Sequence, residues 1–194
     1  MPTAKESRIK NKAKRRNNRK QKNRLNWLQY KQDMLALIRT YDDPILKQKC
    51  DKVQVKDLSA LMTISKMKKI LAYTQNGVGL AAPQIGITKQ IFIFREKLET
   101  GVFKVMINPE IISHGDIILP LKEGCLSFPE TIVNVDRYIE ITVSYLDENF
   151  EAQEKTFVNF VAKIIQHEIE HLSGICKVGE AWEREQFTLV TLEK

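Results

Sequence analysis

The chain has 194 residues, of which 43% are hydrophobic, so it is long enough for one domain with its own core and an appendage. Its formal net charge of +7 is concentrated at the N-terminus, because residues 1–24 hold eleven Lys or Arg and one acid, Glu6. The other 170 residues hold 20 basic and 23 acidic side chains, which excludes a uniformly basic protein and predicts a mildly acidic domain, residues 25–194, behind a basic tail.

The basic tail, residues 1–24, is predicted to be disordered when no partner is bound. Its apolar residues are only Met1, Ala4, Ile9 and Ala13. They are too few to offset the entropy of ordering, and too few for a secretory signal or for the apolar face of a mitochondrial presequence. A phosphate backbone would attract such a charge cluster through counterion release, and a solvated solubility tail is the alternative. The lack of aromatic residues favours backbone contact over base stacking.

The cysteines and the hydropathy of the chain indicate its compartment. The three cysteines, Cys50, Cys125 and Cys176, are an odd number without C-x-x-C spacing, so they do not resemble a disulfide framework. A membrane span would need about 20 consecutive apolar residues, and the sequence contains no such run. We therefore expect a cytoplasmic protein that spans no membrane and has at least one free thiol.

Apolar spacing predicts two helices in the first part of the domain. Residues 25–38 are dense in apolar side chains, consistent with a helix that docks on the domain, and Asp42-Asp43-Pro44 breaks it. Residues 57–74 have helical apolar spacing, and Asn76-Gly77 supplies a stop signal.

Strands and a buried helix are predicted for the rest of the domain. Runs of β-branched and aromatic residues predict strands at 90–95, 103–107, 117–121, 138–145 and 151–158, with residues 147–149 as a hairpin turn between the last two. Residues 160–172 contain neither Gly nor Pro and predict a buried helix. Helix, several strands and then a helix is an order that favours an α+β fold over a doubly wound sheet.

The predicted last helix carries a pattern typical of metal sites, His167-Glu168-Ile169-Glu170-His171. Histidines at i and i+4 project from one helix face, so both can reach one metal, with Glu168 beside a metal-bound water. The helix is otherwise apolar, and buried polar side chains need a compensating partner, which a metal supplies. Ordinary surface or core histidines are the alternative interpretation.

Two histidines leave such a site one protein ligand short. The metzincin continuation fails because its third histidine is replaced by Lys177. The remaining candidates are Cys125, His114, Glu180, Glu183 and Glu185. His114 lies in a turn-like sequence and is expected to be solvated. Cys125 is the strongest candidate because thiolate suits zinc and iron, although a buried structural thiol is the alternative.

A Gly-rich segment, residues 77–86, completes a set of three motifs. Its small residues allow close approach, and Gln84 is a polar group in an apolar stretch, but the Lys and Ser/Thr of a phosphate loop are missing. The three motifs resemble those of the peptide deformylase family: G-x-G-L-A-A-x-Q at residues 77–84, E-G-C-L-S at 123–127 and Q-H-E-x-x-H-L at 166–172. Supporting similarity runs from about residue 38 to residue 174.

The resemblance implies a fold, an activity and a metal. The fold would consist of mostly antiparallel sheets around a central C-terminal helix that carries H-E-x-x-H. The activity would be removal of the formyl group from N-formyl-methionine of nascent polypeptides, with release of formate. Cys125, His167 and His171 would bind one divalent metal, typically Fe(II), and zinc, nickel or cobalt can occupy the same ligands.

The resemblance also implies roles for residues around the metal. Glu168 would transfer the proton from water to the leaving amine, while Gln84 and the Leu126 backbone N–H would donate to the developing oxyanion. The residues expected to line the peptide cleft are Val78, Gly79 and Gly124.

The sequence departs from the family pattern at several positions. Glu170 stands in place of an Asp and is expected to reach Arg137, Ile132 replaces an Arg, and Lys163 occupies a usually apolar position near the methionine pocket. Only twenty residues follow Gly174, too few for the long C-terminal helix that docks bacterial relatives on the ribosome. We therefore hypothesise that the basic tail supplies a contact with ribosomal RNA.

Two rival functions remain at this stage. One is a catalytically inactive deformylase-like protein that binds the ribosome or RNA, and the other is a zinc protease. We expect a monomer in the cytoplasm of a bacterium or a phage-infected host, with an organelle as the alternative. Formate release and metal stoichiometry would distinguish the three functions.

Overall fold

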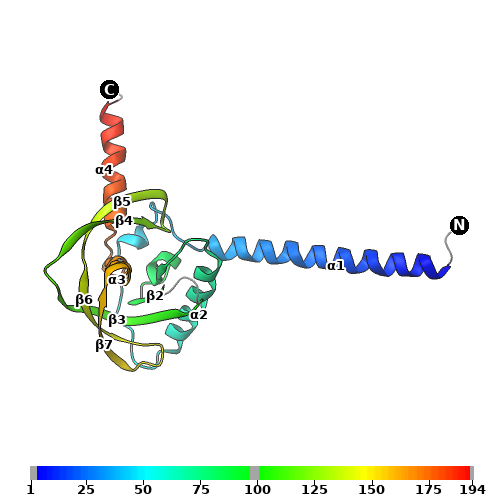
Figure 1. Ribbon diagram of the computed structural model, residues 1–194, viewed down its shortest axis with the longest axis horizontal. Coiled ribbons are helices and arrows are strands. Elements are labelled where there is room, and N and C mark those ends of the chain that lie inside the picture. The colour runs from blue at the N-terminus through cyan, green and yellow to red at the C-terminus, as the bar shows by residue number, and fades with distance from the viewer. Residues whose placement is uncertain (1–3, 97–100, 193–194) are drawn as a thin grey trace. The chain divides into compact units, whose positions relative to one another are not determined.

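The computed structural model describes the backbone of residues 4–96 and 101–192, and the side chains of residues 19–96 and 101–184 (Figure 1). The chain forms two compact units, Met1–Ala36 and Leu37–Lys194. Among the described residues, no helix combines the length and the apolar character needed to cross a membrane.

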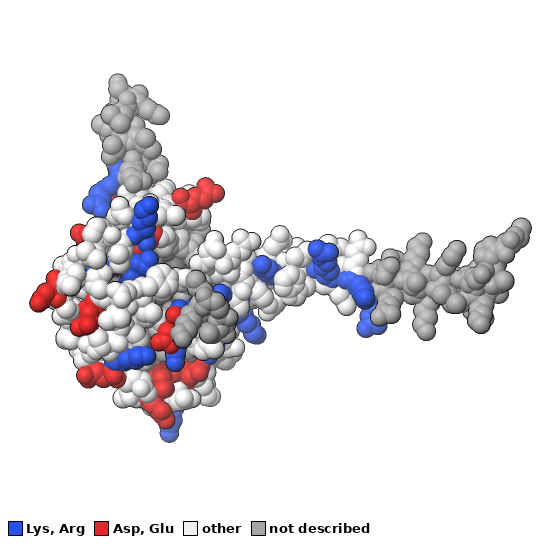
Figure 2. Space-filling model, in the orientation of Figure 1, with Lys and Arg blue, Asp and Glu red and all other residues white. Residues whose placement is uncertain are grey.

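The first unit is the helix α1, Ala4–Leu35. The sequence predicts a disordered tail followed by a separate helix over 25–38, whereas α1 is continuous through residue 24. Residues 4–35 contain neither Gly nor Pro and are rich in Lys, Arg, Gln and Leu, all good helix formers. Lys and Arg side chains stand along the described part of α1, and both signs of charge are scattered over the second unit (Figure 2). The boundary between tail and domain at residue 24 stays a prediction.

The second unit begins with two short helical elements before its sheets. The 3₁₀ helix η1 spans Pro44–Lys47, and the helix α2 spans Leu58–Tyr73, as the apolar spacing predicts. The side chain of Asp57 caps α2 by accepting a hydrogen bond from the Ser59 N–H at 2.8 Å. The inward face of α2 consists of Ala60, Thr63, Ile64, Met67, Ile70 and Leu71.

A five-stranded sheet forms the main layer of the second unit, with strand order β1-β2-β3-β6-β7 and antiparallel pairing throughout. Its strands are β1 Gly79–Ala81, β2 Ile91–Arg95, β3 Phe103–His114, β6 Glu140–Leu146 and β7 Ala152–Val158, with the 3₁₀ helix η2, Ala82–Ile85, after β1. The predicted hairpin between β6 and β7 is confirmed, because Asp147 Oδ1 accepts hydrogen bonds from the N–H groups of Asn149 and Glu151. The three-residue β1, with the sequence Gly-Leu-Ala, contains no β-branched or aromatic residue and therefore no strand signal.

A two-stranded sheet pairs β4, Ile118–Cys125, with β5, Phe128–Tyr138. β5 was not predicted, and the next strand was wrongly predicted to begin at residue 138, although β6 begins at Glu140. In β5 the buried positions Val133, Val135 and Arg137 alternate with exposed polar ones. Because Arg137 is a charged residue at a buried position, the alternation of apolar and polar residues that predicts a strand is interrupted there.

Two helices complete the fold. The helix α3, Asn159–Leu172, is buried as predicted, and it lies in the interior of the second unit, between the sheets (Figure 1). The helix α4, Lys177–Leu192, was not predicted. Gly179 within α4 reads as a helix breaker, but a Cβ there would lie 2.3 Å from the Phe128 ring, so close packing on β5 requires glycine. The α+β class and the mostly antiparallel sheets are confirmed.

Candidate active site

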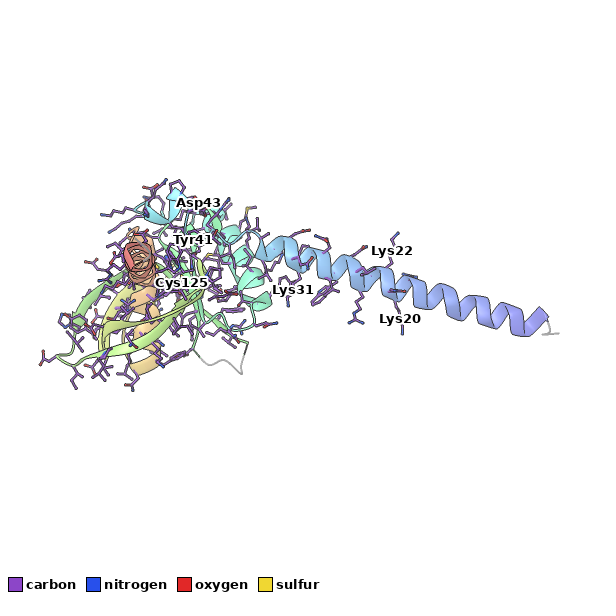
Figure 3. All side chains as sticks on the ribbon, turned by 90° about the horizontal axis from the view of Figure 1, so that it is seen from above. Lys20, Lys22, Lys31, Tyr41, Asp43 and Cys125 are labelled. Atoms are coloured by element: carbon purple, nitrogen blue, oxygen red, sulfur yellow. The ribbon has the colours of Figure 1, made fainter. Side chains whose placement is uncertain are left out.

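The structure brings together three side chains that could hold a metal. His167 and His171 project one turn apart from α3, and Cys125 lies at the end of β4 inside the second unit (Figure 3). One donor atom from each residue falls in a group whose members all lie within 4.8 Å of one another. Cys125 Sγ and His171 Nε2 lie 3.2 Å apart.

The protonation of His171 fits a cation. His171 is fully buried, and this burial, aided by the charges of His167 and Arg137, moves its pKa well below the usual range, so the imidazole is neutral. A neutral imidazole offers a lone pair to a metal. Among the described residues, His171 Nδ1 and Glu168 Oε2 are buried without a hydrogen-bond partner. A cation bound near these residues would compensate the buried Glu168 oxygen, and the His171 Nδ1 would then carry the ring proton.

Glu168 is the most strongly buried carboxyl of the site. Burial raises its pKa to about 7, with smaller and opposing effects from neighbouring charges. Gly79 on β1 lies against this carboxyl, because a Cβ on Gly79 would be only 2.2 Å from Glu168 Oε1. A side chain at residue 79 would therefore displace Glu168.

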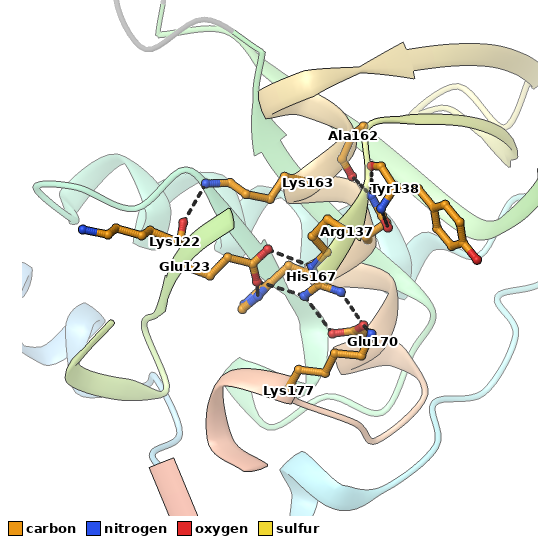
Figure 4. A network of polar contacts seen from close by, with 10 residues as sticks. Lys122, Glu123, Arg137, Tyr138, Ala162, Lys163, His167, Glu170 and Lys177 are labelled. Atoms are coloured by element: carbon orange, nitrogen blue, oxygen red, sulfur yellow. Dashed lines mark hydrogen bonds and ion pairs between the residues drawn. The ribbon is translucent and has the colours of Figure 1, made fainter. Parts of the chain in front are cut away.

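A chain of ion pairs fixes the orientation of His167 (Figure 4). Its Nδ1 lies 3.0 Å from Glu123 Oε2, and Arg137 donates to both oxygens of Glu123 at 2.8 and 2.9 Å. Arg137 also donates to both oxygens of Glu170, which pairs with Lys177 at 3.1 Å. The expected contact between Glu170 and Arg137 is thus present. Negative and positive side chains alternate from Glu123 through Arg137 and Glu170 to Lys177.

The charges of this chain set the protonation of its buried members. Burial alone would raise the pKa of Glu123, but hydrogen bonds from Arg137 and His167 outweigh it and lower the pKa to about 2. Burial likewise opposes the charged form of His167, yet the Glu123 hydrogen bond raises its pKa overall. Because ionised Glu123 can only accept, the His167 Nδ1 carries a proton and Nε2 is the atom available to a ligand.

Gln84 is held on η2 with its amide group in a fixed orientation. Its Oε1 accepts a hydrogen bond from the Ala81 N–H at 2.8 Å, and its Nε2 donates to Ser127 Oγ at 3.1 Å. The same Nε2 lies 3.5 Å from Cys125 Sγ. The amide N–H group is thus directed at the thiol.

A cavity of about 610 Å³ opens onto these groups. Its lining contains all but one of the predicted site residues: Val78, Gly79, Gln84, Gly124, Cys125, Leu126, His167 and Glu168. His171 is the exception, because it lies fully buried. Lys163 and Ile132 also line the cavity. The Lys163 Nζ donates to the Lys122 carbonyl at 3.0 Å, and Ile132 is 72% exposed.

The other candidates for a third ligand lie elsewhere. His114 is exposed at the end of β3, as expected, and stacks on Tyr138 with 3.7 Å between ring centroids. Glu180 is exposed, and Glu183 pairs with Lys47 at 3.2 Å. The side chain of Glu185 lies outside the described residues.

Three residues at the site have no role predicted from the sequence. Glu123 and Ser127 belong to the same motif as Cys125, and a carboxyl beside a predicted ligand is a signal that could have identified Glu123. Cys176, before α4, has no motif to mark it. The interaction with Cys176 and burial both raise the pKa of Cys125, whereas the interaction with Cys125 outweighs burial and lowers the pKa of Cys176 to about 7.

Known proteins resemble this chain over most of its length. A family model described as polypeptide deformylase matches residues 35–186. The peptide deformylase of Pseudothermotoga lettingae is 39% identical over 142 residues, 73% of this chain and 80% of that protein. The one from Brachyspira hyodysenteriae is 41% identical over 147 residues, 73% and 78% of the two chains. A crystal structure of the Acinetobacter baumannii enzyme bound to Met-Ala-Ser matches with a TM-score of 0.66 at 32% identity, covering 73% of this chain and 94% of that one.

Proposed function

Because the chain belongs to the polypeptide deformylase family, we propose that its cavity binds the formyl-methionyl end of nascent polypeptides and that its residues hydrolyse the formyl amide, releasing formate. Members of this family are metalloenzymes that act on formylated nascent peptides. The observation that carries the proposal is the convergence of Cys125, His167, His171 and Glu168 at one cavity. The Met-Ala-Ser bound to the Acinetobacter relative is a peptide that begins with methionine.

Cys125, His167 and His171 would hold one divalent metal. Three protein ligands leave a position open for a small molecule, which is typical of catalytic rather than structural sites. When bound, such a cation supplies Lewis-acid chemistry, polarising a carbonyl oxygen and making water more acidic. Fe(II) is our first choice, and the mixed thiolate and imidazole set also suits zinc, nickel and cobalt.

Glu168 would move the proton. A pKa of about 7 lets its carboxylate take a proton from the attacking water and then give it to the leaving amine nitrogen near neutral pH. The glycine at residue 79 lets this carboxyl lie directly against β1.

Gln84 and Leu126 would stabilise the formyl oxygen as it gains negative charge. The Gln84 amide group is oriented by Ala81 and Ser127, and its second N–H, which is directed at Cys125 Sγ in this structure, would be the donor to the formyl oxygen. Leu126, next to Cys125 in the chain and lining the cavity, would donate its backbone N–H.

Val78, Gly79 and Gly124 would bind the peptide backbone. β1 is an edge strand of the five-stranded sheet, and residues 78 and 79 line the cavity. An extended peptide can therefore add along this edge through backbone hydrogen bonds, while its first side chain enters the cavity.

Formate release tests the proposed function. The full chain, loaded with nickel or anaerobically with iron, is expected to release formate from formyl-Met-Ala-Ser. Glu168→Gln is expected to abolish release while the metal content stays unchanged, and Glu180→Gln, at an exposed acid of α4, serves as the matched control. Absence of formate with metal bound would favour the inactive, ribosome-binding alternative. Metal stoichiometry that survives Cys125→Ala would favour the zinc protease.

The basic residues of α1 would make a separate contact with ribosomal RNA. Lys20 and Lys22 are exposed on the described part of this helix (Figure 3). Phosphate contacts of this kind depend strongly on salt. Deleting residues 1–24 should reduce co-sedimentation with ribosomes at moderate salt, and unchanged co-sedimentation would reject the contact. The chain would act as a cytoplasmic monomer, which sedimentation of the purified protein tests.

A further inference from the structure

Lys163 places a positive charge at the mouth of the 610 Å³ cavity. It lies on α3, four residues before His167 and therefore on the same helix face. Its Nζ donates to the Lys122 carbonyl at 3.0 Å (Figure 4) and lies 4.8 Å from the centre of the Phe160 ring. Lys122 and Phe160 are both exposed, whereas His167 is buried. The ammonium group therefore lies at the rim of the cavity.

These contacts hold the Lys163 ammonium group in place without neutralising it. A carbonyl and an aromatic ring attract a cation but carry no net charge, and the Lys122 carbonyl occupies only one of the three N–H donors. Among the described residues, no carboxylate lies within ion-pair distance of the Lys163 Nζ. The same is true of Lys122, which also lines the cavity. Both lysines therefore have capacity for an acidic ligand.

The acids of the cavity lining do not compensate these two lysines. Glu123 is paired with Arg137, and Glu168 lies buried against Gly79 of β1. Glu130 is exposed on β5 and pairs with neither lysine. The part of the cavity mouth beside α3 is therefore positively charged, which suits a carboxylate on the substrate.

We propose that Lys163 is a specificity-determining residue whose ammonium group binds an acidic side chain at the third residue of the formylated peptide. This proposal rests on the proposed function, in which an extended peptide adds along β1 and its first side chain enters the cavity. Successive side chains of an extended peptide point to opposite sides. The third side chain thus returns to the side of the first, about 7 Å further along, where it can reach the cavity mouth. The second side chain points away from the cavity.

The contact predicts a preference of defined size and salt dependence. An ion pair that stays partly exposed is expected to raise kcat/KM by about threefold to fivefold when Asp replaces Asn at the third residue. The gain should appear in KM, because a group remote from the formyl amide contributes equally to binding of the ground state and the transition state. It should largely disappear in 1 M salt, where the screening length is about 3 Å.

Paired peptides test this preference with the full, nickel-loaded chain. Formyl-Met-Ala-Asp-amide is compared with formyl-Met-Ala-Asn-amide, and formyl-Met-Asp-Ala-amide with formyl-Met-Asn-Ala-amide. The C-terminal amide removes the terminal carboxylate, which would otherwise compete for the same lysine. The ratio of kcat/KM for Asp over Asn is expected to be about three to five at the third residue and about one at the second. A ratio of one at the third residue, or a preference confined to the second, would overturn the proposal.

Substitutions at Lys163 assign the preference to its charge. Lys163→Met keeps the length of the side chain and should bring the ratio at the third residue to about one, whereas Lys163→Arg should retain the preference. Lys163→Glu should invert it. Lys52→Met, at an exposed lysine outside the cavity lining, removes the same charge elsewhere and should leave the ratio unchanged. A ratio in Lys163→Met equal to that of the wild type would overturn the role of Lys163.

Peptide binding without turnover separates this proposal from the deformylase activity. Met-Ala-Asp-amide and Met-Ala-Asn-amide lack the formyl group, so their binding to the nickel-loaded chain, measured by calorimetry, requires no hydrolysis. The Asp peptide is expected to bind about threefold to fivefold more tightly. Tighter binding of the Asp peptide without formate release from any formylated peptide would reject only the deformylase. Formate release with equal binding and equal kcat/KM for the two peptides would reject only the role of Lys163.

Discussion

Nδ1 of His167 lies 3.0 Å from Oε2 of Glu123, so a candidate metal ligand is oriented by a carboxylate on the neighbouring strand β4. Arg137 holds that carboxylate in turn through two further hydrogen bonds. Partners of this kind fix the tautomer and direction of a ligating imidazole. The ion-pair chain therefore links the stability of the core to the geometry of the site.

Glu123→Gln should weaken metal binding and lower stability together. The amide accepts fewer hydrogen bonds and leaves the Arg137 charge with only Glu170 as a partner. We expect metal affinity to fall by about 10- to 100-fold, and the free energy of unfolding to fall by about 3 kcal/mol. Chelator competition and urea unfolding measure the two effects. Glu154→Gln, at an exposed residue of β7, should change neither; equal effects in both variants would contradict the assignment.

Substitutions at the centre and at the exposed end of the ion-pair chain should differ in their cost to stability. Arg137 is 1% exposed and its planar fork contacts both Glu123 and Glu170, a geometry that Lys cannot reproduce. Arg137→Lys should destabilise the fold by about 3–5 kcal/mol. Lys177→Ala removes an exposed partner and should cost less than about 1 kcal/mol. Similar midpoints of urea unfolding for the two variants would contradict this ranking.

Gly79→Ala should impair activity through Glu168. The added methyl group would lie 2.2 Å from the Glu168 Oε1, so the carboxyl or β1 must shift. Overpacking of this kind costs about 1–3 kcal/mol, and we expect kcat for formate release to fall more than KM rises. Gly115→Ala is the control, because its nearest contact would be an ordinary 3.4 Å. An unchanged kcat in Gly79→Ala would show that the reaction does not depend on this position of the Glu168 carboxyl.

The stability of the metal-free protein should depend on the ionisation of Glu168. Its pKa rises from 4.5 to about 7 on folding, so the folded state binds more protons than the unfolded state between these values. The free energy of unfolding therefore falls as pH rises from about 4.5 to about 7, by up to about 3 kcal/mol, and then levels off. In the Glu168→Gln variant, this pH-dependent part of the free energy of unfolding should be absent. Parallel stability curves for the two proteins, measured in a chelator, would contradict the raised pKa.

Periodicity predicted the elements whose patterns are local. The apolar spacing of residues 57–74 and 160–172 corresponds to α2 and α3, and the turn at Asp147 corresponds to the β6–β7 hairpin. The elements that were missed depend on distant partners. β1 is ordered by pairing with β2, and α4 tolerates Gly179 because Phe128 of β5 fills the space beside it.

The candidate site was also predicted only where its residues follow a local pattern. The motifs name Cys125, His167, His171 and Glu168, because ligand spacing is a local property. The contact between Glu123 and Arg137, and the neighbouring thiol of Cys176, arise only when segments far apart in the chain fold together. A single sequence contains no spacing rule for such contacts.

Cys125 belongs to the two-stranded sheet, whereas His167 and His171 belong to the helix that packs on the five-stranded sheet. A cation bound by these residues would therefore also link the two-stranded sheet to α3. The contact between these two layers is otherwise non-covalent. Its removal should speed amide hydrogen exchange in β4 and β5 before it affects β2 and β3. The chemistry of the site and the cohesion of the layers would then depend on the same three donor atoms.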